Sequence, residues 1–242
     1  MKINKKFWVS MAVGTLASGL FLSGPKILRW QIEKRLPGVE FKNATLSTSG
    51  VTLTGVTINR GWVSGTVDTV TSDFKGEHVL LDGGTLSLNL DDKPTGTGTS
   101  KKDIQVKNID AHVSHTGHKI TMNGVHTDGN KVCFSSANLE APTITSGKGC
   151  YDREDHRFSL DRAELKELKI SGVTASDTTA TDITFDTQSK VAKVGTVTTK
   201  VTLEGQEFQV EAHGVVASRK PDKVNLESLK VKHPWRSEEH TS

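Results

Sequence analysis

The chain has 242 residues, of which 34% are hydrophobic and 24% charged, and its formal net charge is +3. This composition supports a folded core and excludes a wholly disordered chain. Its two cysteines are too few for a disulfide-dense scaffold or a cysteine-rich zinc module. Residues 1–35 hold seven basic residues and one acidic residue, a balance of +6, which leaves −3 for the remainder. An acidic body argues against binding to the phosphates of nucleic acid, so we expect no nucleic-acid partner.

The amino-terminal segment predicts a membrane anchor over residues 1–24. Residues 7–22 (FWVSMAVGTLASGLFL) carry no charge, and with residues 23–25 they reach the length that a bilayer crossing needs. The pattern favours a single-pass membrane protein with its N-terminus in the cytoplasm and its body outside, so membrane lipids are expected partners. A cleaved signal peptide is the alternative.

Two further features adjoin this anchor. Ser10, Gly14 and Ser18 recur every four residues, a spacing that would permit a homodimer through the anchor helix, although small residues are common in membrane helices. Residues 25–38 predict an amphipathic helix, because Leu28 and Ile32 share one face with basic residues between them. Pro37-Gly38 ends that helix.

The body, residues 39–235, predicts strands throughout. Apolar residues alternate with Thr, Ser and charged residues, which is typical of strands with one dry and one wet face. A phase slip at Gly55 indicates a bulge. Residues 160–170 favour strand over helix, and a loop is expected at 91–102. We predict turns at 59–61, 83–84, 116–117, 123–124, 128–130 and 204–205.

The predicted fold class is therefore all-β with an N-terminal transmembrane helix, its extended antiparallel sheet curled into a groove or a sandwich. The alternating apolar residues are the candidates for a lipid-groove lining. They are Val51, Leu53, Leu86, Leu88, Leu90, Ile104, Val106, Ile183, Phe185, Val201 and Leu203.

Other motifs give weaker indications. Cys133 and Cys150 predict a disulfide if the body lies in an oxidising compartment. His112, His115, His118 and His126 are interpreted as hairpin-surface histidines rather than metal ligands, with His115 facing His118. The SxxK pattern at Ser72–Lys75 lacks its companion motifs, and the acidic run 152–155 is typical of a solvated loop. We therefore predict no catalytic residues, no metal and no cofactor, and hence no enzyme.

The last seven residues, RSEEHTS (236–242), match the translation of a common sequencing adapter. We expect them to be an artefact, with the natural sequence departing near Trp235, and exclude them from functional reasoning.

The order of parts resembles the AsmA-like superfamily of bacterial envelope proteins. The residues that carry the resemblance are the anchor at 7–22, the segment ILRWQIEKRLPG (27–38) and the strands VTLTGVTI (51–58), LLDGGTLSLNL (80–90) and LKISGV (168–173). This resemblance implies a single-pass protein of the bacterial inner membrane with its body in the periplasm. It also implies a twisted sheet forming an apolar groove, and a role in lipid handling or envelope maintenance with phospholipid acyl chains and inner-membrane lipids as partners. The alternative is a non-catalytic, β-rich N-terminal spacer of an envelope enzyme such as a peptidoglycan glycosyltransferase.

Overall fold

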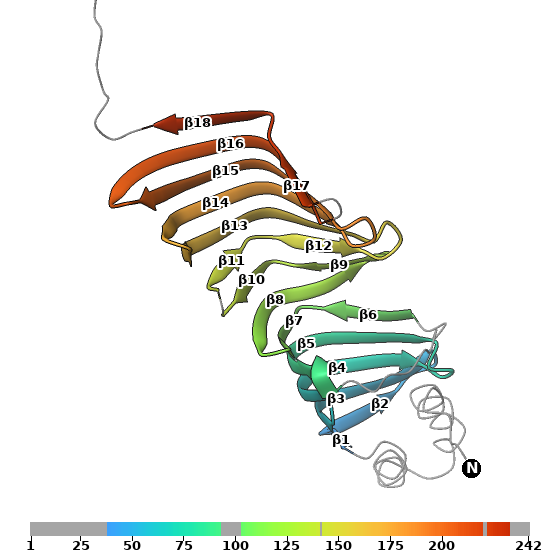
Figure 1. Ribbon diagram of the computed structural model, residues 1–242. Coiled ribbons are helices and arrows are strands. Elements are labelled where there is room, and N and C mark those ends of the chain that lie inside the picture. Colours follow the sequence, from blue (N-terminus) through green and yellow to red (C-terminus); the bar gives the residue numbers. More distant parts are fainter. Residues whose placement is uncertain (1–37, 93–102, 141, 220–221, 233–242) are drawn as a thin grey trace, which may run out of the picture. The chain divides into compact units, whose positions relative to one another are not determined.

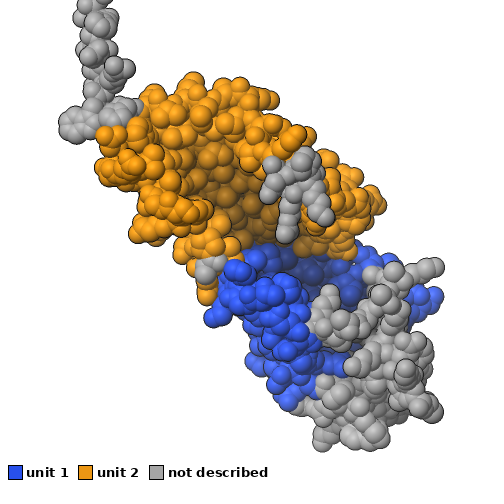
Figure 2. Space-filling model, viewed as in Figure 1, with its two compact units in different colours: residues 1–127 blue, residues 128–242 orange. Residues whose placement is uncertain are grey.

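The computed structural model describes residues 38–92, 103–140, 142–219 and 222–232. The predicted anchor, most of the amphipathic helix and the adapter-like tail lie outside these ranges, as do residues 93–102 of the predicted loop. Within the ranges, the structure contains no helix with the length and apolarity that a membrane crossing requires. The described chain is all-β and divides into two units, residues 1–127 and 128–242 (Figures 1 and 2).

Unit 1 is a mixed sheet built on three long strands. Its elements are β1 (Val39–Glu40), β2 (Asn43–Leu46), β3 (Gly50–Arg60), β4 (Val63–Asp73), β5 (His78–Asn89), the 3-10 turn η2 (Leu90–Asp92), β6 (Asp103–Lys107), β7 (Ile109–His115) and β8 (His118–Asp128). β3, β4 and β5 pair antiparallel, whereas β6 and β7 both run parallel to β5. The prediction of a purely antiparallel sheet is therefore wrong here, because the chain crosses over after η2 instead of making a hairpin.

Unit 2 is a meander of long antiparallel strands with short strands at its start and end. Its elements are β9 (Lys131–Phe134), β10 (Ser136–Leu139), β11 (Ile144–Ser146), β12 (Gly149–Asp152), β13 (Arg157–Ile170), β14 (Val173–Asp186), β15 (Val191–Leu203), β16 (Gln206–Arg219), β17 (Asp222–Asn225) and β18 (Ser228–Lys232). β13 to β16 lie side by side in chain order (Figure 1). β17 and β18 follow one another along β16.

Several sequence predictions concern the connections. The structure confirms strand over residues 160–170 and tight turns at Thr116–Gly117 and Glu204–Gly205. The predicted turns at 83–84 and 123–124 are wrong, because these residues lie inside β5 and β8. Gly83 and Gly124 have φ angles of 71° and 61°, which produce irregularities within a strand instead of reversing it.

The core is concentrated in unit 1. The most deeply buried side chains there are Val67 and Ile109, and they are accompanied by Phe41, Val51, Val56, Val79, Ala111 and Val125. In unit 2 only Cys133, Phe134 and Ala212 are buried hydrophobic residues among those described. Unit 1 therefore buries more of its apolar side chains than unit 2 does.

Candidate binding surface

The apolar surface of unit 2 is one continuous face of its sheet. Directly opposed residues of antiparallel strands point to the same side, so the register defines rows across the sheet. One row consists of Leu160, Ile183, Val194 and Val215, and the next of Ala163, Ala180, Val197, Ala212 and Leu229. Further rows run from Leu165 to Val231 and from Leu168 to Phe208. The opposite face carries mainly Thr, Ser, Lys, Arg and Glu, with Val191 and Val216 among them.

This face stays apolar because the strands change phase together. Asp182 has a φ of 54° and Gly214 a φ of 60°, and neither is bridged to the strand beside it. Gly195 lies between them, and a Cβ there would meet the Asp182 side chain. Residues of this face consequently step by three at these positions, as from Leu160 to Ala163, and also beside the left-handed Asp177, as from Leu165 to Leu168. They step by two elsewhere. Each left-handed residue inserts one extra residue into the alternation, so the apolar side chains that follow it stay on the apolar face. With strict alternation those side chains would point to the polar face.

No second sheet covers this face within the described residues, because all strands of unit 2 belong to the one sheet. Most of the apolar side chains are partly buried, as are Thr181, Thr196 and His213 on the other face, where the charged side chains of Arg162, Glu164 and Lys200 are exposed. Figure 2 shows that the visible side of unit 2 is hollowed.

The sequence-predicted lining residues of unit 2 share this face. Ile183 and Phe185 are neighbours on β14, and Val201 and Leu203 lie further along the sheet on β15. Sequence reasoning missed most of the surface, including Leu165, Val194, Val197, Val210 and Val215. The signal that could have found them is the three-residue step between apolar positions.

Seven of the predicted lining residues belong to unit 1, and six of them lie in strands. These six fall into two separate sets of cross-strand neighbours. Val51 connects through Ser72 and Val79 to Ile104, and Leu53 connects through Val70 and Leu81 to Val106. Leu86 and Leu88 lie on β5 beyond Gly83. The expectation that Leu90 continues their strand is wrong, because Leu90 begins η2. Asn89 hydrogen-bonds Asp92 and Asp91 there, which favours a turn.

The two cysteines lie on neighbouring strands of unit 2. Cys133 on β9 is directly opposite Cys150 on β12, and their sulfur atoms are joined in a disulfide. The disulfide predicted from the sequence therefore joins two paired strands. The adjacent residue Phe134 stacks on Phe158, with 6.0 Å between ring centroids. The disulfide therefore fixes the end of the sheet at which the aromatic side chains cluster.

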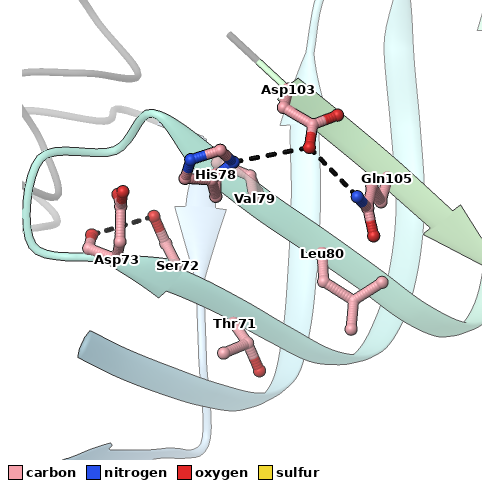
Figure 3. Close-up of a pocket in the computed structure, with 8 residues that line it drawn as sticks. All are labelled: Thr71, Ser72, Asp73, His78, Val79, Leu80, Asp103 and Gln105. Carbon is pink, nitrogen blue, oxygen red and sulfur yellow. Dashed lines mark hydrogen bonds and ion pairs between the residues drawn. The ribbon is translucent and has the colours of Figure 1, made fainter. Parts of the chain in front are cut away.

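A pocket of about 310 Å³ lies in unit 1 between β4, β5 and β6 (Figure 3). Asp103 Oδ2 accepts a hydrogen bond from Gln105 Nε2 at 3.0 Å and lies 3.4 Å from His78 Nδ1. Ser72 is buried, and its hydroxyl donates to the carbonyl oxygen of Asp73. The His78 side chain is 71% exposed, so water screens the pair. Ser72 also lies on a strand instead of opening a helix, so the SxxK pattern lacks its structural context.

Three histidines of the β7–β8 hairpin, His112, His115 and His118, are exposed, whereas His126 is half-buried and its Nδ1 lies 3.0 Å from the carbonyl oxygen of Gly124. His115 and His118 face each other as expected, while His112 pairs with Thr121. The Asp91 carboxylate lies 2.9 Å from His115 Nδ1 and accepts the Thr116 N–H, so it supports the hairpin tip. Within the described ranges, no three His, Cys, Asp or Glu side chains are grouped so as to hold a metal.

Asp152 and Asp186 each begin a hairpin turn in unit 2. The N–H groups of Ser189 and Gln188 donate to Asp186 Oδ1, and those of Asp155 and Glu154 donate to Asp152 Oδ1. These backbone hydrogen bonds, led by the one from Ser189 and the one from Asp155, hold the pKa of each carboxyl below its ordinary value of 3.8. The carboxylates therefore stabilise turns, and the acidic run at 152–155 is explained without catalysis.

Acid is expected to weaken these two turns. A carboxyl with a lowered pKa in the folded state contributes stability above pH 3.8, and this is lost as the pH falls through its folded pKa. The double variant Asp152→Asn/Asp186→Asn keeps the acceptor oxygens but cannot titrate. Thermal unfolding followed at pH 7 and below pH 3.8 should show a smaller acid-induced fall in Tm for the variant than for the wild type. Parallel falls would contradict this account.

A comparison with family models finds no match to this chain, and no curated protein matches it in sequence.

Proposed function

We propose that this protein is a membrane-anchored periplasmic protein that holds phospholipid acyl chains on the apolar face of unit 2, in lipid handling or envelope maintenance. The observation that carries the proposal is the continuous, half-exposed aliphatic surface over β13 to β16 with no covering layer among the described residues. Soluble proteins rarely leave so large an apolar surface open unless it binds something.

The chemistry of the surface favours acyl chains over a flat aromatic or polar ligand. Its central rows consist of Val, Ile, Leu and Ala, with Thr178 and Thr199 hydrogen-bonded to each other at 2.7 Å, so that neither hydroxyl needs a ligand. Each methylene that moves from water onto such a surface contributes roughly 0.8 kcal/mol. The anchor predicted at 1–24 would place the surface beside a source of lipid, and the disulfide is consistent with an oxidising compartment.

The proposal is tested by photocrosslinking in vesicles. The full chain is reconstituted with a phospholipid that carries a photoactivatable group on its acyl chain, and crosslinked residues are mapped by mass spectrometry. Crosslinks are expected on the apolar face between residues 157 and 217. Ile183→Glu should reduce them at least tenfold, because an unpaired charge in an acyl-chain site is costly.

The neighbouring substitution Thr184→Glu is the matched control. Thr184 lies on the opposite face, where the carboxylate introduced by this substitution can form an ion pair with the ammonium group of its cross-strand neighbour Lys193. This variant should crosslink like the wild type, and circular dichroism should show that both variants retain their strands. Crosslinks restricted to residues 1–37, or equal loss in both variants, would contradict lipid binding by this face and favour the spacer function.

A further inference from the structure

The deepest burial in unit 1 follows one row across its sheet. Val56 on β3 lies opposite Val67 on β4, and Ile109 on β7 lies opposite Val125 on β8. Gly84 on β5 lies between these two pairs. Val67, Val56 and Ile109 are only 1%, 2% and 2% exposed. The most deeply buried residues of unit 1 thus lie in one line that runs across the strands from β3 to β8.

The described strands of unit 1 do not account for this burial. All of them belong to one sheet, so no second described layer lies over the row. The sheet of unit 2 has the same kind of left-handed residue beside its corresponding row, yet that row is only partly buried apart from Ala212. The row of unit 2 consists of Ala163, Ala180, Val197 and Ala212. An irregular strand alone therefore does not explain why the row of unit 1 is closed.

Two segments of unit 1 lie outside the described residues, 1–37 and 93–102. Residues 93–102 (KPTGTGTSKK) contain only Lys, Pro, Thr, Gly and Ser, so they cannot form an apolar layer. Within 1–37, residues 7–22 are predicted to cross the membrane. This leaves residues 25–36 (PKILRWQIEKRL), whose predicted helix has an aliphatic stripe formed by Leu28, Ile32 and Leu36.

The point at which this segment joins the sheet favours contact with the row. Only Pro37 and Gly38 separate it from β1, which pairs with the part of β3 that follows Val56. Gly38 has a φ of 84°, an angle that suits a sharp change of chain direction, and its carbonyl oxygen accepts the Asn59 N–H. A helix over residues 25–36 would be about 18 Å long. The strands β3, β4, β5, β7 and β8 together span about 19 Å, so one helix lying across them can cover the row.

We propose that residues 25–36 form a helix that docks on the apolar face of unit 1. Leu28, Ile32 and Leu36 pack against the row from Val56 to Val125, while the basic side chains between them remain in water. The segment is then a cover for unit 1 instead of a helix lying among lipid headgroups. This docking does not depend on whether unit 2 holds lipid.

Photocrosslinking within the full chain tests this inference. Photoactivatable p-benzoylphenylalanine replaces Ile32, the chain is reconstituted in phospholipid vesicles, and crosslinked residues are mapped by mass spectrometry. Mixing isotope-labelled with unlabelled chains separates crosslinks within one chain from those between two copies. The same probe in place of Lys34 is the matched control, because residues two apart lie on nearly opposite sides of a helix.

The probe at position 32 should crosslink to residues 51–125 of its own chain at least ten times more often than the probe at position 34. Crosslinks from position 32 to lipid would overturn the proposal in favour of a helix on the membrane surface. Crosslinks to residues 128–232 or to a second copy would overturn it as well.

Hydrogen exchange on two further variants checks the contact without a bulky probe. Ile32→Glu places a charge in the apolar contact, and Lys34→Gln changes the net charge by the same amount on the other side of the helix. In Ile32→Glu the amides of Val56 and Val67 should exchange at least tenfold faster, while those of β13 to β16 stay as in the wild type. Lys34→Gln should leave both sets unchanged. Wild-type exchange in Ile32→Glu, or equal acceleration in both variants, would show that the sheet of unit 1 buries its own row.

Discussion

Replacing Gly84 by alanine is expected to destabilise unit 1 by about 2–4 kcal/mol. Gly84 lies in the middle of β5, opposite the buried Val67, with a φ of 104°. A side chain is strained at that angle, and the added Cβ would collide with the backbone carbonyl of Thr66 on β4. Backbone in the centre of a sheet cannot move aside without losing ladder hydrogen bonds. Urea unfolding followed by circular dichroism measures the effect.

Gly117→Ala is the matched control for this prediction. Gly117 also has a positive φ, 80°, but nothing lies within 4 Å of the Cβ it would acquire. Its substitution should cost only the conformational strain, roughly 1–2 kcal/mol. Equal losses in the two variants would show that the close approach of β4 and β5 at Gly84 contributes nothing.

Loss of the disulfide is expected to lower the stability of unit 2 by roughly 3 kcal/mol, because the bond closes a loop between residues 17 apart in the sequence. The effect should be pronounced because unit 2 buries few apolar side chains and has little other core. Cys133→Ala/Cys150→Ala should unfold at a lower urea concentration than the wild type. The backbone amides of β9 and β12 should also exchange their hydrogens faster in the variant than in the wild type.

Reductant provides the internal control for the disulfide. Dithiothreitol should move the wild type towards the double variant and leave the variant itself unchanged. In unreduced native protein, both thiols should resist alkylation. Reaction of Cys133 and Cys150 with an alkylating agent before any reductant is added would show that the bond does not form in the native protein.

The alternation of apolar and polar residues determined the all-β fold by itself, because a strand places successive side chains on opposite faces whatever its partners are. Leu86 and Leu88, or Ile183 and Phe185, are recognisable as pairs on one face without any knowledge of their neighbours. The sequence also predicted the hairpin at Thr116–Gly117, because a glycine next to a polar residue suits the left-handed angles of a tight turn.

The tertiary structure alone decided where alternation is interrupted and which face stays open. Gly83, Gly84 and Gly124 have the same turn chemistry as Gly117, yet they lie inside β5 and β8. Asp182 lies at the three-residue step from Ala180 to Ile183, but only the strands beside it show that its backbone is left-handed. The parallel pairing of β5 with β6 and β7 is a long-range contact that no local pattern encodes. For the same reason, the open apolar face of unit 2 became visible only once the rows were aligned across four strands.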